Sequence, residues 1–295
     1  MVRESSKLKE GGKTTVLGIQ HVFAMFGSTV LVPALTGLDP AVTLLCMGIG
    51  TLIFHLITGF KVPAFMGSSF SFITAIGAVS AYCVDKGIDN FASYVGWGIM
   101  ASGVLYLILA GMVKLFGAKR ITNFFPPIVT GCMIIIIGMM LAPTAMNNII
   151  TVTDVPLWKN WVVAIFTVAT IIGVMFFTKG FIKLVPILIG IIVGYVLSLA
   201  LGMVDISSVA EAPIFELPKV TFPAIKNWSA ITYAITMIAP ISIVTFVEHV
   251  GDITANGAVT GHNYIEDPGL HRTLLGDGIG SIVGALFGGF PNTTY

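Results

Sequence analysis

Two carboxylates stand within a long apolar stretch of the sequence. Glu248 and Asp252 follow the apolar run 230–243 and are four residues apart, so a helix would place both on one face, one turn from each other. A carboxylate at membrane depth is costly, and it usually marks a substrate or proton path. The alternative is that the helix has ended before Glu248, whose carboxylate would then lie among the lipid headgroups.

The elements that must position these carboxylates are membrane-spanning helices. Of the 295 residues, 56% are hydrophobic and 10% are charged, against about 25% charged in an ordinary soluble domain. The composition therefore predicts an all-α polytopic membrane protein. With about 20 residues per crossing, we predict nine spans, at about 15–35, 41–60, 66–84, 93–115, 127–146, 160–178, 184–204, 230–250 and 273–290.

Lysine and arginine are distributed unevenly over the loops between these spans. With a cytoplasmic N-terminus, eleven of the fifteen lie on the inner side, and only Lys86, Lys159, Lys219 and Lys226 lie outside. Positive charge accumulates in the cytoplasmic loops of membrane proteins. We therefore expect a multi-pass protein of the inner (plasma) membrane whose N-terminus is cytoplasmic.

Two stretches of the chain resemble each other. Residues 44–53 and 274–283 agree at five of ten positions, at an offset of 230 residues. Gln20-His21-Val22 matches Glu248-His249-Val250 at an offset of 228. Equivalent spans are seven apart, an odd number, so the two copies must have opposite topology, as in the inverted repeats of secondary transporters. The alternative is a coincidence between glycine-rich apolar helices.

The repeat divides the chain into predicted segments. Residues 1–14 form a cytoplasmic N-terminus, 15–204 a first seven-span repeat, 205–229 an external connection and 230–295 the start of a second repeat. The second copy stops where its third span would begin. We therefore expect a C-terminally truncated fragment that transports little or nothing by itself.

Further ionisable residues lie within the predicted spans. Asp277 stands mid-span where the first copy has Met47, which favours a proton-coupling or structural role. His21, in the first span, could orient a site carboxylate or relay a proton, or it could pack between helices as a neutral side chain. His249 points away from the face that carries Glu248 and Asp252.

Hydroxyl and aromatic side chains follow a proline at two repeat-related places. Ser69 and Phe70 belong to the segment 63–72, and Tyr295 belongs to its counterpart, 290–295. Transporter sites often form where a broken helix frees backbone groups to face a cavity. Aromatic faces can stack on a flat polar ring while carboxylate and backbone groups bond its edge. The alternative is that the hydroxyls only pack between helices.

Several motifs together carry a resemblance to a known family. They are Gln20-His21, Gly67-Ser68-Ser69-Phe70, Glu248-His249-Val250-Gly251-Asp252 and Pro291-Asn292-Thr293-Thr294-Tyr295. With them, essentially the whole chain resembles the nucleobase–ascorbate transporter (nucleobase:cation symporter) family. The opening residues 20–27, the loop 267–272 and the Asn-Thr-Thr-Tyr ending are typical of its bacterial uracil-transporting branch.

The resemblance implies fourteen spans in two inverted seven-span repeats. Spans one to four and eight to eleven would form a core domain and spans five to seven part of a gate domain, with short antiparallel strands in the broken spans three and ten. The same resemblance implies that Glu248 bonds the substrate ring, that Phe70 and Ser69 flank it, and that Tyr295 contacts it from the other strand. Asp252 stands where some family members have histidine, so the proton-coupling group is open between Glu248, Asp252 and Asp277.

The function implied by the resemblance is the import of uracil, or a related nucleobase, by proton symport. The proton would be the coupling ion, with no other cofactor and no metal. The partners would be the nucleobase, the lipid bilayer and, because family members are often dimers, a second copy of the chain. Nothing points to a nucleic acid.

Other functions fit the sequence less well. A symporter of xanthine or another nucleobase and an anion exchanger of the same inverted-repeat fold are the alternatives. An exchanger should have a basic side chain or a positive helix end at the midplane, but no Lys or Arg falls in the middle of a predicted span. An enzyme is not indicated, because no HExxH, Walker A or Gly-x-Ser-x-Gly pattern is present.

Overall fold

A computed structural model describes Met25 and residues 29–122, 127–151, 155–180, 182–184, 186–204 and 217–295. These residues are mainly helical. Four helical stretches are long and apolar enough to cross a membrane, namely Pro40–Thr58, Ala92–Phe116, Leu157–Phe177 and Trp228–Thr260. Shorter apolar helices cover Phe70–Asp85, Ile135–Ile150 and Pro186–Ala200. The architecture confirms the predicted class of polytopic α-helical membrane protein.

The described residues fall into two compact units. The first, called the strand unit here, comprises the described residues between 29 and 141 and Leu217–Tyr295. The second, the α7–α8 unit, includes the described residues between 142 and 204. Helix α6 (Pro127–Ile150), which has Pro143 in its interior, continues from the first unit into the second. The segment boundaries expected from the repeat stay predictions.

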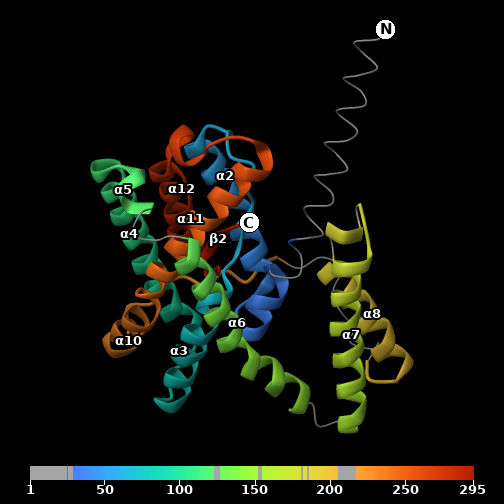
Figure 1. Ribbon diagram of the computed structural model, residues 1–295. Coiled ribbons are helices and arrows are strands. Elements are labelled where there is room, and N and C mark those ends of the chain that lie inside the picture. Colours follow the sequence, from blue (N-terminus) through green and yellow to red (C-terminus); the bar gives the residue numbers. More distant parts are fainter. Residues whose placement is uncertain are drawn as a thin grey trace. The chain divides into compact units, whose positions relative to one another are not determined.

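The strand unit contains the predicted site. Its elements are α2 (Pro40–Thr58), β1 (Met66–Ser68), the 3₁₀ turn η1 (Phe70–Phe72), α3 (Ile73–Asp85), α4 (Ala92–Phe116), α5 (Ala118–Thr122), α10 (Trp228–Ile238), α11 (Ile241–Thr260), the π turn η3 (Ile265–Gly269), α12 (Leu270–Leu286) and β2 (Asn292–Thr294). Helix α12 packs most extensively against α4 and α2. Strand β2 contacts α11 and α12, and it is labelled among these helices in Figure 1.

The span expected at 230–250 is two helices in sequence. Helix α10 ends at Ile238, and α11 begins at Ile241 after Pro240, which has no backbone N–H to continue the ladder of the preceding helix. Helix α11 then runs to Thr260, ten residues beyond the predicted end. Glu248 therefore lies in the middle of a helix, and the alternative that the helix ends before it is wrong.

The span expected at 66–84 is broken, as its sequence indicated. Strand β1, the turn η1 and α3 follow one another, and β1 pairs antiparallel with β2. Gly67 lies opposite Thr293 in this register. A Cβ atom on Gly67 would come within 2.7 Å of the ring of Tyr295, so glycine is needed for the close approach. The paired strands confirm the expected antiparallel strands of the two broken spans.

Helices α2 and α12 cross at two repeat-related glycines. Gly50 and Gly280 are equivalent in the 230-residue alignment, and a Cβ on Gly280 would lie 3.2 Å from the Cα of Gly50. On one side of this crossing, the Cys46 thiol donates to the carbonyl of Gly284 at 3.6 Å. In the 230-residue alignment, Cys46 corresponds to Gly276 and Gly284 corresponds to Phe54, and Gly276 and Phe54 are also in contact. The contacts thus repeat about a two-fold centre at the glycines.

The strands are attached to these helices by equivalent hydrogen bonds. The backbone N–H of Met66 in β1 donates to Thr51 Oγ1 on α2 at 3.1 Å. The backbone N–H of Asn292 in β2 donates to Ser281 Oγ on α12 at 3.0 Å. Thr51 and Ser281 are equivalent in the sequence repeat. An inverted repeat requires such pairs of contacts, and the strand unit contains them.

The α7–α8 unit is a helical hairpin. Helix α7 (Leu157–Phe177) is followed by η2 (Ile182–Leu184) and α8 (Pro186–Ala200), and the two long helices pack together. Gly190 and Gly194 of α8 allow close contact with side chains of α7. At one end, Lys159 Nζ donates to the carbonyl of Leu201 at 2.6 Å.

Candidate functional site

Glu248 contacts the broken third span. Ser71, in η1, donates from its Oγ to Glu248 Oε2 at 3.2 Å. Ser69 of the same segment was predicted to flank the substrate; its side chain is fully buried, and its hydroxyl has no hydrogen-bond partner among the described residues. Ser71 is therefore a site residue that the sequence analysis missed. The three hydroxyl residues of the run 68–71 were a signal for the segment, although not for the individual residue.

An apolar cavity of about 380 Å³ lies beside this hydrogen bond. Ser71 and Thr74 supply its hydroxyl groups, and the remaining lining residues are Ala75, Ala78, Ile136, Ile137, Met140, Met237, Ile241 and Val244. Phe70 lines a small neighbouring hollow together with Ser71. Small-molecule sites are typically cavities of roughly 300–1,000 Å³ with mostly apolar walls and a few polar groups. A small planar molecule would fit this description.

A second hollow of the same size lies at the C-terminal end of α11. It is lined by residues 253–265, among them Gly257 and Gly261, and contains none of the predicted site residues. We therefore place the candidate binding site at the cavity beside Ser71, where a buried carboxylate is within reach.

Asp252 faces the other strand. Thr294, in β2, donates from its Oγ1 to Asp252 Oδ2 at 3.4 Å. Glu248 and Asp252 are both partly buried and stand one turn apart on α11. The two carboxylates share the helical face expected from their spacing, but they have different partners. Glu248 contacts η1 of the first copy, and Asp252 contacts β2 of the second.

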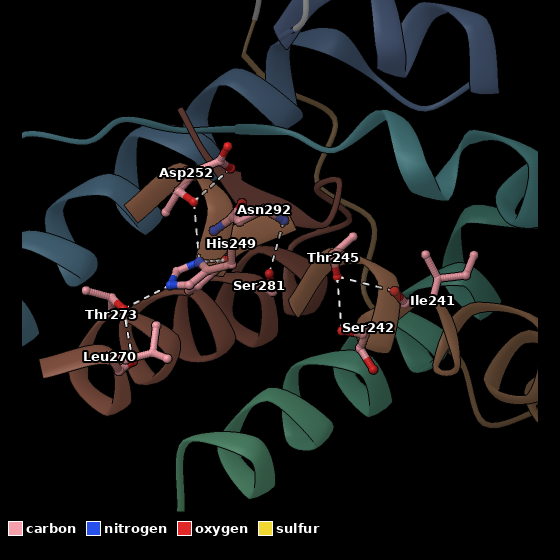
Figure 2. A network of polar contacts seen from close by, with 11 residues as sticks. Ile241, Ser242, Thr245, His249, Asp252, Leu270, Thr273, Ser281 and Asn292 are labelled. Carbon is pink, nitrogen blue, oxygen red and sulfur yellow. Dashed lines mark hydrogen bonds and ion pairs between the residues drawn. The ribbon is translucent and has the colours of Figure 1, made fainter. Parts of the chain in front are cut away.

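Asp277 is buried on α12 and interacts with His249. The distance between His249 Nδ1 and Asp277 Oδ2 is 3.1 Å, and both side chains are at most 1% exposed. His249 Nε2 lies 2.9 Å from Thr273 Oγ1, and Nδ1 lies 3.3 Å from Thr294 Oγ1. Figure 2 shows the imidazole between Thr273 and Asp252. The sequence analysis placed His249 away from the Glu248 face and did not predict its contact with Asp277. That contact depends on how α12 packs against α11.

Tyr295 lies against β1. Its hydroxyl donates to the carbonyl of Ser68 at 3.0 Å, and its ring covers Gly67. Whether Tyr295 contacts a substrate stays a prediction, as do the roles of Ser69 and Phe70. His21 lies outside the described residues. Within the described residues, no group of three or more His, Cys, Asp or Glu side chains is arranged to hold a metal ion.

Comparison with known proteins places the chain in a family. The sequence profile of the Permease family matches residues 12–295. The chain belongs to this family. Together with the apolar helices, this membership makes it a multi-pass membrane protein and supports the resemblance noted from its motifs.

Several curated relatives of the chain are named uracil permeases. The "Probable uracil permease" of Haemophilus influenzae is 43% identical over 298 residues, which cover 100% of this chain and 68% of the relative. The "Uracil permease" of Bacillus caldolyticus is 40% identical, over 96% of this chain and 65% of the relative. The Escherichia coli K12 "Uracil permease" is 36% identical, over 96% and 64%. The chain thus spans about two thirds of the length of these relatives.

A solved structure shares the fold. The transmembrane domain of the cyanobacterial bicarbonate transporter BicA matches with a TM-score of 0.53 and 18% identity, over 93% of this chain and 74% of that one. At this identity the likeness shows the fold alone. It says nothing about the molecule that this chain carries.

Proposed function

We propose that the protein carrying this chain imports uracil, or a closely related pyrimidine base, across the inner membrane by proton symport. The observation that carries the proposal is Glu248, a carboxylate in the middle of an apolar helix, bonded by Ser71 beside an apolar cavity. The names of the curated relatives support uracil as the substrate.

The chemistry of a carboxyl group suits the edge of a uracil ring. A protonated Glu248 has one O–H donor and a remaining acceptor oxygen, so it can donate to a ring carbonyl and accept from a ring N–H. Phe70 would offer an aromatic face to the flat ring, since it lines the hollow next to Ser71. Tyr295 and the backbone of the paired strands would contact the ring from the opposite side.

The proton is the proposed coupling ion because the candidate site is acidic. Glu248, Asp252 and Asp277 lie near one another on α11 and α12, and ionised carboxylates at membrane depth are costly. Taking up a proton together with the substrate would lower that cost during transport. Lysine and arginine placement supports a cytoplasmic N-terminus, and a homodimer is the proposed assembly.

Uptake of radiolabelled uracil tests the role of Glu248. The full-length protein carrying Glu248→Ala should take up uracil about 10- to 100-fold more slowly than the parent, because it loses two hydrogen bonds to the ring, each contributing about 0.5–1.5 kcal/mol. Glu248→Gln keeps the shape and should lose less binding than transport. Glu266→Gln removes an exposed acid of η3 and serves as the matched control, with uptake unchanged. Undiminished uptake by the Glu248→Ala variant would contradict the assignment.

Competition separates uracil from the other candidate substrates. Excess unlabelled uracil should suppress the uptake, whereas xanthine, chloride and bicarbonate should not. A xanthine-sensitive uptake would indicate a purine symporter. Stabilisation of the purified protein by bicarbonate, and not by uracil, would indicate an anion exchanger, because a ligand raises the unfolding temperature of the state that binds it.

A further inference from the structure

A chain of hydrogen bonds joins two carboxylates of the strand unit. Thr294 Oγ1 lies 3.4 Å from Asp252 Oδ2 and 3.3 Å from His249 Nδ1. His249 Nδ1 in turn lies 3.1 Å from Asp277 Oδ2. In Figure 2 dashed lines lead from Asp252 toward the imidazole of His249. The link between α11 and α12 therefore passes through a hydroxyl of β2.

The hydrogen-bond partners of His249 determine which ring nitrogen carries a proton. Thr273 Oγ1 donates its single proton to the carbonyl of Leu270 at 2.9 Å, since a carbonyl can only accept. His249 Nε2, 2.9 Å from the same Thr273 oxygen, must then be the donor of that contact. Nδ1 is left to share a proton with Asp277, either as imidazolium and carboxylate or as imidazole and carboxylic acid.

Burial favours this neutral, proton-sharing pair. The side chains of His249 and Asp277 are 0% and 1% exposed, and an unpaired buried charge is strongly destabilising. With one proton between Nδ1 and Oδ2, the pair has no net charge in either form. The shared proton can therefore change its position without adding a charge to the interior.

The Thr294 hydroxyl connects this pair to Asp252. An ionised Asp252 can only accept, so Thr294 donates to it, and the threonine oxygen is open to Nδ1–H of His249. A protonated Asp252 can instead donate to the threonine oxygen, and the Thr294 proton then turns toward Nδ1. Nδ1 carries no proton in that state, so the shared proton lies on Asp277 Oδ2, and the single Nδ1 lone pair accepts from both the Thr294 and Asp277 hydroxyls in a three-centre hydrogen bond. The added proton stays on Asp252, and no proton is lost.

We propose that Thr294 and His249 are positioning residues that couple the protonation of Asp252 to the paired strands. The inference rests on the proposed function. Strand β2 carries Thr294 and is followed by Tyr295, and its partner β1 leads to Ser71, which holds Glu248. A change of the Thr294 hydrogen bond thus reaches both strands of the candidate substrate site.

The titratable groups around His249 come from three helices. Asp277 faces it from α12, and the ring of Tyr106 faces it edge-on from α4 at 6.2 Å between ring centroids. Glu248 and Asp252 are its neighbours on α11. Each of these carboxylates can contribute to a pH profile, so the test changes the threonine, which does not titrate.

The test compares Thr294→Val with the full-length parent. Uracil affinity of the purified protein is measured at a series of pH values, alongside uptake. Valine keeps the shape of threonine and removes the hydroxyl, so we expect the midpoint of the affinity profile to move by at least about half a pH unit, an approximately threefold change in Kd at fixed pH. Infrared difference spectra of the carboxyl C=O band, recorded without substrate, should show the same displacement for Asp252.

Three further variants control this experiment. Thr58→Val removes a buried hydroxyl that bonds only carbonyls of its own helix, so its profile should match the parent. Thr294→Ser restores a hydroxyl and should return the profile toward the parent, whereas a merely structural role would not predict this rescue. His249→Gln should flatten the profile if it folds, and Thr294→Val decides the matter if it does not.

The possible failures are distinguishable. A Thr294→Val variant that binds uracil with the parent's pH profile and infrared midpoint overturns the coupling proposal alone. A parent that binds no uracil at any pH overturns the proposed function, and the coupling of protons to a uracil site with it.

Discussion

In the strand unit, the two repeat copies hold their strands by the same kind of hydrogen bond but differ in their ionisable side chains. In the first copy, β1 is bonded to α2 through Thr51, and in the second, β2 is bonded to α12 through Ser281, at nearly equal distances. One turn before these hydroxyl residues, the first copy has the apolar Met47 and the second has Asp277, and both side chains are buried. The frame is symmetric, whereas the ionisable groups are not.

The difference extends to the rest of the site. In the sequence repeat, Glu248 and Asp252 of the second copy correspond to the uncharged Gln20 and Ala24 of the first. The acids therefore belong to one copy, while Ser71 of the other copy holds Glu248. The symmetric frame supplies two paired strands at helix breaks, and the acids of one copy make their surroundings chemically asymmetric.

Placing an acid in the first copy should have the largest effect on stability. Met47 is fully buried in the hydrophobic core of the strand unit. The repeat counterpart of His249 is His21, which lies outside the described residues. Met47→Asp should lower the free energy of unfolding by about 3–5 kcal/mol, the usual cost of an uncompensated buried charge. Thermal unfolding in detergent measures the loss.

Met47→Leu is the control for this comparison. It conserves volume and should cost less than about 1.5 kcal/mol. Equal unfolding temperatures for the aspartate and leucine variants would show that the first copy tolerates an acid, and the asymmetry of the two copies would then need a reason other than burial.

The frame could be predicted from sequence more completely than the site. The 230-residue offset identified Gly50 and Gly280 as equivalents, and they meet at the helix crossing. Local patterns are sufficient there, because proline and glycine act through the backbone of their own segment. The helix breaks after α2 and α12 were indicated by the same local patterns, whereas the paired strands within them were implied by the family resemblance.

The contacts of the acids were less predictable because they depend on tertiary packing. On a helical wheel, His249 is about 100° from Glu248, and its partner Asp277 lies 28 residues away on another helix. Similarly, Ser71 and not Ser69 meets Glu248, because the chain changes from strand to 3₁₀ turn between them. Where a strand changes into a 3₁₀ turn, the alternation of side chains along the sequence no longer predicts which residue faces the neighbouring helix.

The helix crossing provides a second, smaller test of symmetry. A methyl group on Gly50 would overlap the side-chain nitrogen (Nδ2) of Asn292, and one on Gly280 would lie 2.7 Å from the same atom. Gly50→Ala and Gly280→Ala should each cost about 1–3 kcal/mol, as is typical of overpacking. Thermal unfolding should give similar losses for the two.

The control for the crossing lies two residues away in the same helix. A methyl group on Gly48 would have no neighbouring atom within 4 Å, so Gly48→Ala should be neutral or stabilise the helix by up to about 1 kcal/mol, the difference in helix propensity. If Gly48→Ala and Gly50→Ala had equal effects, the close approach at the crossing would not constrain the fold.

The smallest expected effect comes from the hydroxyls that hold the strands. Thr51→Val and Ser281→Ala each remove the acceptor of one buried strand N–H. Hydrogen bonds between membrane helices contribute about 0.6 kcal/mol on average and up to about 1.7, so both variants should lose stability within this range and by similar amounts. Unfolding temperatures of the two single variants and of the double variant measure this directly. A clearly larger loss for Ser281→Ala would mean that β2 depends on its helix more than β1 does. The reason would be that β2 also contacts Asp252 through Thr294. The strand contacts themselves would then differ between the copies in the same way as the acids do.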